Sequence, residues 1–115
     1  MTAEPGPAGP DGPRWLADAM LGRLARYLRF LGHDTAYVRG LDDRRIRVLS
    51  VEEHRTLLTR DRILARQATG AFLIRGVEIR GQLRELFGAF PHLPRRVTFD
   101  RCPECNQRLR PWTTR

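Results

Sequence analysis

The sequence predicts an α/β fold with a central, mainly parallel sheet of four to five strands and helices on both faces. Short apolar runs alternate four times with amphipathic helical segments, and the connections between them are short. Right-handed crossovers between such strands bring their carboxyl ends to one edge of the sheet. The 115 residues suit one domain, and the 41% hydrophobic content is enough for one modest core.

The first predicted strand covers residues 15–17 and ends at Asp18, and a helix is expected to begin immediately after it. Gly32 is the expected end of that helix, because glycine favours the backbone conformation that follows a last helical turn. Apolar side chains share one arc of the helical wheel: Met20, Leu21, Leu24, Ala25, Leu28 and Leu31. Three arginines are expected on the opposite, solvent-facing side: Arg23, Arg26 and Arg29.

The remaining elements follow in the same rhythm. Further strands are predicted within residues 33–40, 56–59 and 71–76, and further helices over 41–54, 62–70 and 77–90. Residues 92–99 are expected to be irregular or to add a strand. Residues 1–13 are rich in proline and glycine, bury little, and are expected to be a disordered tail.

Acidic residues follow three of the predicted strands. Asp18 and Asp61 end the first and third strands, and Asp42 and Asp43 start the helix after the second. All of them should therefore lie at one sheet edge, where α/β folds bind their ligands. A cluster of carboxylates repels itself unless it binds a cation, and oxygen ligands suit Mg²⁺ or Mn²⁺. Spacing alone leaves a second interpretation equally open, in which each aspartate caps a helix.

The charge balance favours an acidic partner. A formal net charge of +8 points to nucleic acid, and Arg23, Arg26 and Arg60 are the candidates for contacts with RNA phosphates. The other interpretation is that these arginines only form a solvated surface. Glycine-rich phosphate loops are missing, which leaves a nucleotide cofactor unsupported. The sequence also shows neither a membrane-length apolar run nor a secretory signal, so we expect a cytoplasmic protein with no membrane partner.

Three segments together carry a resemblance to a known family: LADAMLGRLARYLRFLGHDT, LDD and LLTRD. Over roughly residues 14–105 the chain resembles the mutator-seven C-terminal RNase family, a branch of the PIN-like nucleases. The resemblance implies a PIN-like three-layer α/β/α sandwich that cleaves RNA with a divalent metal. By motif position, Asp18, Asp43 and Asp61 match the acids of that family and are the expected catalytic and metal-binding residues, with Asp42 as the fallback.

The sequence departs from the family pattern in two places. PIN-like nucleases often carry a fourth acid, for which Glu78 is only a weak candidate. The family usually ends in a zinc ribbon with two cysteine pairs, whereas here Cys102 and Cys105 form one CPEC pair, which supplies two of the four ligands of a zinc site. The expected organisation is thus a tail over residues 1–13, a nuclease domain over 14–99 and a partial zinc ribbon over 100–115.

The sequence therefore predicts a ribonuclease in which Asp18, Asp43 and Asp61 bind one or two Mg²⁺ or Mn²⁺ ions, so that metal activates water and neutralises developing charge. Zn²⁺ at the cysteine pair is a further expected cofactor. Two alternatives stay open: a catalytically silent RNA-binding module, and a toxin-like nuclease subunit held by a small acidic antitoxin. Besides RNA and an acidic protein, a second copy of the chain is a possible partner, which would give a homodimer. Thr59, at the end of its strand, could orient water or only pack.

Overall fold

The computed structural model describes residues 14–94 and 101–108. The strands are β1 (Arg14–Ala17), β2 (Asp34–Tyr37), β3 (Thr56–Thr59) and β4 (Phe72–Leu73). The helices are a 3₁₀ turn, η1 (Ala19–Leu21), followed by α1 (Gly22–Phe30), α2 (Asp43–Glu52), α3 (Arg62–Gln67) and α4 (Ile79–Ala89). The tail predicted over residues 1–13 and part of the 92–99 segment lie outside the described residues.

The four strands form one sheet in the order β2-β1-β3-β4, and every neighbouring pair is parallel. Leu16 of β1 pairs with Ala36 of β2 on one side and with Leu57 of β3 on the other. The parallel sheet predicted from the strand–helix rhythm is therefore confirmed. Because all four strands run the same way, the residues that follow each strand share one edge.

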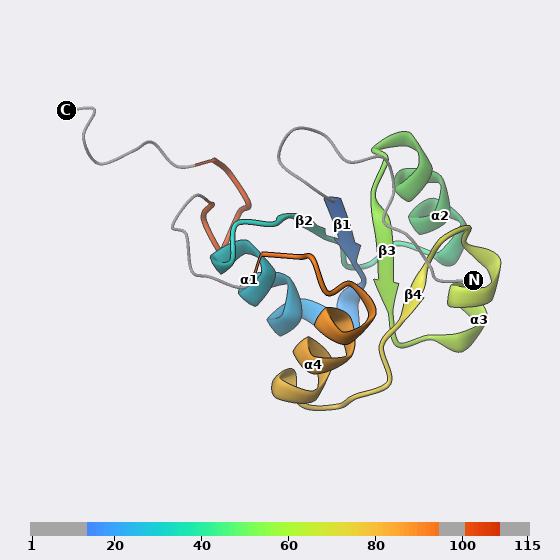
Figure 1. The fold of residues 1–115 in the computed structure, drawn as a ribbon. Helices are drawn as coiled ribbons and strands as arrows, with labels where there is room; N and C mark the ends of the chain where they lie inside the picture. Colours follow the sequence, from blue (N-terminus) through green and yellow to red (C-terminus); the bar gives the residue numbers. More distant parts are fainter. Residues whose placement is uncertain (1–13, 95–100, 109–115) are drawn as a thin grey trace.

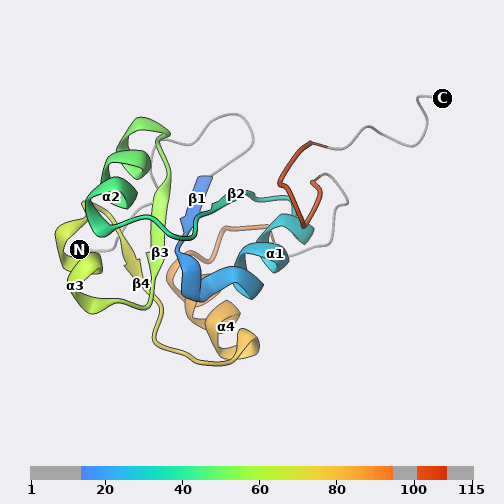
Figure 2. The same ribbon diagram turned by 180° about the vertical axis from the view of Figure 1, so that it is seen from behind.

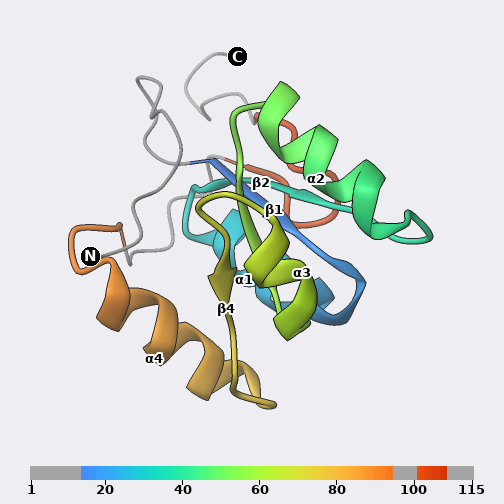
Figure 3. The same ribbon diagram turned by 90° about the vertical axis from the view of Figure 1, so that its right-hand side faces the viewer.

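Helices cover both faces of the sheet (Figure 1). The face that carries Trp15 and Leu58 packs against α1 and α4, whereas the face that carries Leu16 and Leu57 packs against α2 and α3. Views from behind and from the side show the same separation of the helix pairs (Figures 2 and 3). Neighbouring strand residues thus serve opposite cores, as expected from the period-two alternation of strand side chains. The result is a three-layer α/β/α arrangement consistent with a PIN-like sandwich.

The helix after β1 differs from its predicted form at its start and in the burial of one arginine. A 3₁₀ turn precedes α1, and in that turn Met20 is 63% exposed instead of facing the core. Arg29, expected on the solvent side, is only 7% exposed, so this expectation is wrong. The physical reason is that residues 101–108 cover the last turn of α1, a contact that a helical wheel cannot contain. Gly32 follows the helix with φ +87°, which confirms its role as the stop.

The loop 101–108 is bound to the sandwich by a buried guanidinium. Arg29 Nε donates to the carbonyl of Thr35 at 2.8 Å, and Nη1 donates to the carbonyls of Pro103 and Glu104 at 2.9 and 3.0 Å. The Thr35 amide in turn donates to the side-chain oxygen of Asn106 at 2.9 Å. Figures 1 and 2 both show this loop beside the carboxyl end of α1. The CPEC segment thus packs against α1 and β2.

Arginine side chains surround the Asp34 carboxylate at the opposite edge of the sheet, where the strands begin. Its carboxylate lies 2.8 Å from Arg55 Nη1, 3.3 Å from Arg14 Nε and 3.7 Å from Arg101 Nη2. Asn106 Nδ2 donates to the same carboxylate at 2.8 Å. Burial alone would raise the pKa of Asp34, but the hydrogen bonds from Asn106 and Arg55 and the nearby arginine charges outweigh it, so the pKa is lowered.

A buried tryptophan–histidine pair links β1 to the end of α4. Trp15 Nε1 donates to His33 Nδ1 at 2.9 Å, and His33 Nε2 lies 2.8 Å from the carbonyl of Pro94. The imidazole is therefore neutral, with its proton on Nε2, and it also lies across from the ring of Phe87. Burial lowers the pKa of His33, although the Pro94 carbonyl acts in the opposite direction. His33 is thus a core residue.

Acidification is expected to destabilise the fold through His33. The unfolded chain takes up a proton at His33 near pH 6.5, but the folded chain resists it, because a proton on Nδ1 would face the Trp15 donor. Stability should therefore be constant above about pH 6.5 and fall as the pH drops from there toward the lowered pKa of the folded state. Urea unfolding followed by circular dichroism at several pH values measures this. His33→Gln keeps an acceptor for Trp15 and should remove the slope, and a stability that rises on acidification would contradict the interpretation.

Candidate active site

Hydrogen bonds through one threonine connect two of the predicted acidic residues at the edge where the strands end. The hydroxyl of Thr59, the last residue of β3, donates to Asp18 Oδ2. The same hydroxyl oxygen accepts the backbone amide of Asp61 at 3.0 Å. Asp18 directly follows β1, the neighbour of β3, and its own amide donates to the Leu58 carbonyl at 3.2 Å. Parallel pairing of β1 with β3 therefore places Asp18, Thr59 and Asp61 in one connected chain.

Both acids also cap the segments that follow them. Asp18 Oδ1 accepts the amide of Met20 at 3.2 Å, and Asp61 Oδ1 accepts the amides of Ile63 and Leu64 at 2.9 and 3.1 Å. The capping interpretation left open by the sequence is thus confirmed for each. Asp61 Oδ2 stays outside these bonds, and Asp61 is exposed whereas Asp18 is buried. Capping with one oxygen leaves the other oxygen of Asp61 for a ligand.

The acids after β2 have different positions. Asp42 caps α2 by accepting the amide of Arg45 at 2.8 Å, and Asp43 is the exposed first residue of α2. Across residues 14–94 and 101–108, no three acidic, histidine or cysteine side chains are grouped closely enough to hold a metal ion. The sheet topology brings Asp43 to the same edge as Asp18 and Asp61, but Asp43 stays outside the chain linked by Thr59.

The donor chemistry of the linked pair suits a hard divalent cation. Asp18 and Asp61 offer only carboxylate oxygens, and Mg²⁺ is commonly held by one or two carboxylates with water completing its octahedron. The Thr59 hydroxyl links the Asp18 carboxylate to the backbone amide of Asp61, so the two residues are neighbours at this edge. By the chemistry of their donor atoms, both residues therefore fit a cation of this kind.

A tyrosine that the sequence analysis missed supports Asp18 from the next strand. The hydroxyl of Tyr37, at the end of β2, donates to the Ala19 carbonyl at 2.8 Å. A Cβ at Gly22 would lie 3.1 Å from that hydroxyl, so the glycine leaves room for the ring beside α1. Tyr37 thus holds the turn that begins at Asp18. The only signal in the sequence was an aromatic residue near the end of the second predicted strand.

The arginines proposed for RNA occupy different environments. Arg23 is exposed on α1, while Arg26 is exposed but forms an ion pair with Glu104 at 2.9 Å. Arg60, between Thr59 and Asp61, donates from Nη2 to the Arg75 carbonyl at 3.4 Å, and its Nε is buried with no hydrogen-bond partner in the described structure. Arg60 is therefore held beside the linked acids, and Arg23 lies one helical turn beyond Asp18.

The loop between β4 and α4 forms the far side of this region. Glu85 accepts the amides of Arg75 and Gly76, and Gln82 Nε2 donates to the Gly76 carbonyl at 3.0 Å. A Cβ at Gly76 would lie 2.7 Å from Glu85 Oε2, so a larger residue there would require the Glu85 carboxylate to shift. These bonds fix the loop that leads to Glu78, the first residue before α4.

The cysteine pair lies in the loop that Arg29 holds. The Asn106 amide donates to the Cys102 carbonyl at 2.8 Å, and the Cys102 amide donates to the Gln107 carbonyl at 3.0 Å, which closes a tight turn around CPEC. Backbone hydrogen bonds from Cys105 and Glu104 and the Cys105 thiol lower the pKa of Cys102. Both thiols are free, and in the described ranges they have no additional ligand side chains that would complete a metal group.

A comparison with known protein families identifies the family of this chain. The model of the Mut7-C RNAse domain family matches residues 13–115. The chain belongs to the Mut7-C RNase domain family. The match spans every described strand and helix, including the strand ends that carry Asp18 and Asp61. No match was found among curated proteins or among solved structures.

Membership confirms the resemblance seen in the motifs and makes this a nuclease-type domain. The parallel topology of the sheet explains why Asp18 and Asp61 lie at one edge, because each residue comes shortly after a strand of that sheet. None of the helices in the described part of the chain is sufficiently long and apolar to span a bilayer.

Proposed function

We propose that this Mut7-C domain is a metal-dependent ribonuclease whose cation site is formed by Asp18 and Asp61. The observation that carries the proposal is the chain from Asp18 through the Thr59 hydroxyl to the Asp61 amide, at the carboxyl edge of a parallel sheet. Mg²⁺ or Mn²⁺ bound there would supply neutralisation of phosphate charge and activation of water. Asp43, from the same edge, is the third acid of the proposal, and Asp42 remains its fallback.

The residues around the pair have separate tasks in this proposal. Thr59 acts as a positioning residue in this proposal, because its hydroxyl contacts both the Asp18 carboxylate and the Asp61 backbone amide. Arg60, which directly precedes Asp61, and Arg23, at the start of α1, would hold the RNA phosphates, as the net charge of +8 favours. Arg26, which pairs with Glu104, would contribute only after leaving that exposed contact. Zinc at Cys102 and Cys105 would need ligands beyond this pair.

A silent RNA-binding module is the second candidate function, because both acids also serve as helix caps. A third, a toxin-like subunit held by an acidic partner, draws only on the basic charge. Metal binding separates the metal-dependent ribonuclease from the silent RNA-binding module.

Metal should raise the melting temperature if Asp18 and Asp61 form a cation site. Binding to the folded state alone, at a hundredfold excess over Kd, contributes about 2.7 kcal/mol. Thermal melting in millimolar Mn²⁺ or Mg²⁺, compared with metal-free buffer, measures the effect. Asp61→Asn should lose the increase, and the matched change Glu52→Gln, at an exposed carboxylate of α2, should keep it. Identical melting with and without metal would contradict the site.

A further inference from the structure

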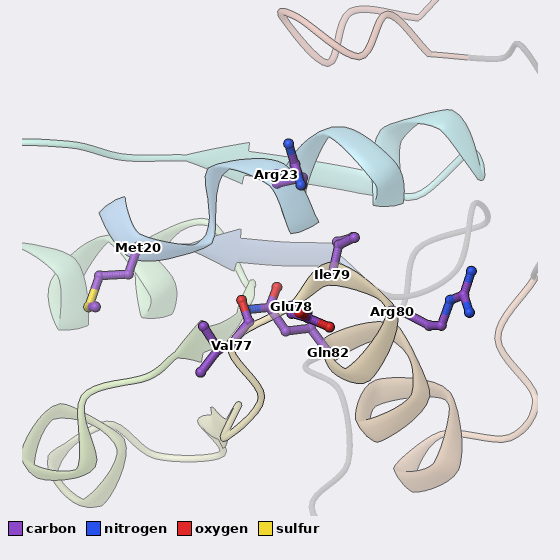
Figure 4. Close-up of a pocket in the computed structure, with 7 residues that line it drawn as sticks. All are labelled: Met20, Arg23, Val77, Glu78, Ile79, Arg80 and Gln82. Carbon is purple, nitrogen blue, oxygen red and sulfur yellow. The ribbon is translucent and has the colours of Figure 1, made fainter.

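A pocket of about 500 Å³ lies between the start of α1 and the start of α4. Met20 and Arg23 line it from the segment after β1 (Figure 4). The other side is lined by residues just before and within the first turn of α4: Val77, Glu78, Ile79, Arg80 and Gln82. Pockets of this size accommodate small organic groups such as a nucleoside.

Two exposed apolar side chains give the pocket a surface for a flat ring. Met20 is 63% exposed and Val77 is 77% exposed. In Figure 4 both lie on one side of Glu78, while Arg80 lies on the other side. RNA-binding proteins commonly take unstacked bases against apolar and aromatic side chains, and the arginines on the margins can meet the adjoining phosphates. This combination of apolar surface and flanking cations matches one nucleotide of a single strand.

Glu78 provides a way to distinguish one base from another. It occupies the N-cap position of α4, but its side chain makes no capping hydrogen bond. The exposed carboxylate therefore remains available in the pocket. A carboxylate only accepts hydrogen bonds. Among the four bases, guanine alone presents two neighbouring N–H donors, N1–H and the N2 amino group, to a two-oxygen acceptor.

The pocket adjoins the linked acids through the backbone. The Met20 amide donates to Asp18 Oδ1 at 3.2 Å. On the other side, the Ile74 amide donates to the Thr59 carbonyl at 2.8 Å, three residues before Val77. A base held between Met20 and Val77 would thus belong to a nucleotide next to the phosphate that the acids face.

We propose that this pocket binds one unpaired guanine of the RNA, with Met20 and Val77 against the ring and Glu78 accepting from its N1–H and N2 amino groups. The inference rests on the proposed ribonuclease function and adds a base preference to it.

The test measures binding without divalent metal, so that it does not depend on cleavage. The probes are a short oligouridylate with one central guanosine, and matched oligomers with adenosine or an abasic ribose in that place. Fluorescence anisotropy gives their affinities for the full chain and for Glu78→Gln, Met20→Ser and Val77→Ser. Glu52→Gln and Val51→Ser, exposed on α2 away from the pocket, are the matched controls. Cleavage of the same oligomers with Mn²⁺ is measured separately.

The guanosine oligomer should bind about tenfold more tightly than the adenosine oligomer, which corresponds to one good bidentate contact. Glu78→Gln should lose this preference while its affinity for the adenosine oligomer stays the same. Met20→Ser and Val77→Ser should weaken the guanosine oligomer but not the abasic one, and the two controls should match the wild type.

Equal affinity of the wild type for all three oligomers would overturn the inference, as would a guanosine preference that survives in Glu78→Gln. Loss of Mn²⁺-dependent cleavage of every oligomer in Glu78→Gln, with unchanged binding, would instead make Glu78 a metal ligand and also overturn it. Guanosine-selective binding without any cleavage by the wild type would leave the pocket intact and remove the proposed ribonuclease function.

Discussion

Asp61→Asn is expected to fold normally and to lose RNA cleavage by roughly a hundredfold or more, because a metal contributes several kcal/mol to the transition state. Asparagine keeps the oxygen that accepts the amides of Ile63 and Leu64, so the cap of α3 persists. It removes the negative charge that the proposed cation site requires. Cleavage of a labelled single-stranded RNA with Mn²⁺, together with a melting curve, gives both readouts.

Two further variants show whether the effect comes from the site. Thr59→Val has nearly the same shape but lacks the hydroxyl that joins Asp18 to the Asp61 amide, and it should also reduce cleavage. Glu52→Gln removes one exposed carboxylate from α2 and should cut RNA at the wild-type rate. A folded Asp61→Asn protein that still cleaves at the wild-type rate would eliminate the proposed mechanism and favour the RNA-binding module.

Arg29→Met is expected to cost about 3 kcal/mol of unfolding free energy, because hydrogen bonds from a charged donor contribute about 1.5–3 kcal/mol and the change leaves three carbonyls without that donor. Those carbonyls belong to Thr35, Pro103 and Glu104. Methionine fills much of the same volume, so the loss reports the polar contacts and not a cavity. Urea unfolding gives the free energy, and limited proteolysis reports whether residues 101–108 have left the sandwich.

Arg23→Met serves as the matched control, since Arg23 lies on the same helix but is exposed. It should leave stability within about 0.5 kcal/mol of the wild type, as is usual for surface changes. Equal stability of the Arg29 and Arg23 variants would mean that the 101–108 loop does not depend on the buried guanidinium.

Local patterns in the sequence were sufficient to predict the layers of the sandwich. The apolar run at 15–17 and the buried segment 56–59 mark strands whose side chains face opposite cores, and alternation with helices fixes their parallel direction. The fourth strand proved shorter than predicted, at Phe72–Leu73 only. The length of this edge strand is set by its pairing with β3. The sequence of residues 71–76 alone contains no information about that pairing.

The candidate site was predicted only in part, because it too depends on contacts between segments that are separate in the sequence. Strand-end position brought Asp18 and Asp61 to one edge, but their link depends on Thr59 facing Asp18 from the adjacent strand. Capping and metal binding use the same residue type at the same place, so spacing could not separate them. Arg29 was placed in solvent because the helix pattern contains no information about a loop more than seventy positions later in the chain.

The contact between Arg29 and the 101–108 loop also sets an order for folding. Arg29 meets Pro103 and Glu104 across sequence separations of 74 and 75 residues, far longer than the separations within any helix or strand pair. Contacts between residues that are distant in the sequence tend to form after local ones, because the entropic cost of closing the intervening loop comes before the contacts stabilise the chain. Synthesis proceeds from the amino end, so α1 emerges with the Arg29 side chain in water, as the helix pattern depicts. We therefore expect its burial to be a late step in folding, completed when the CPEC loop closes over the last turn of the first helix.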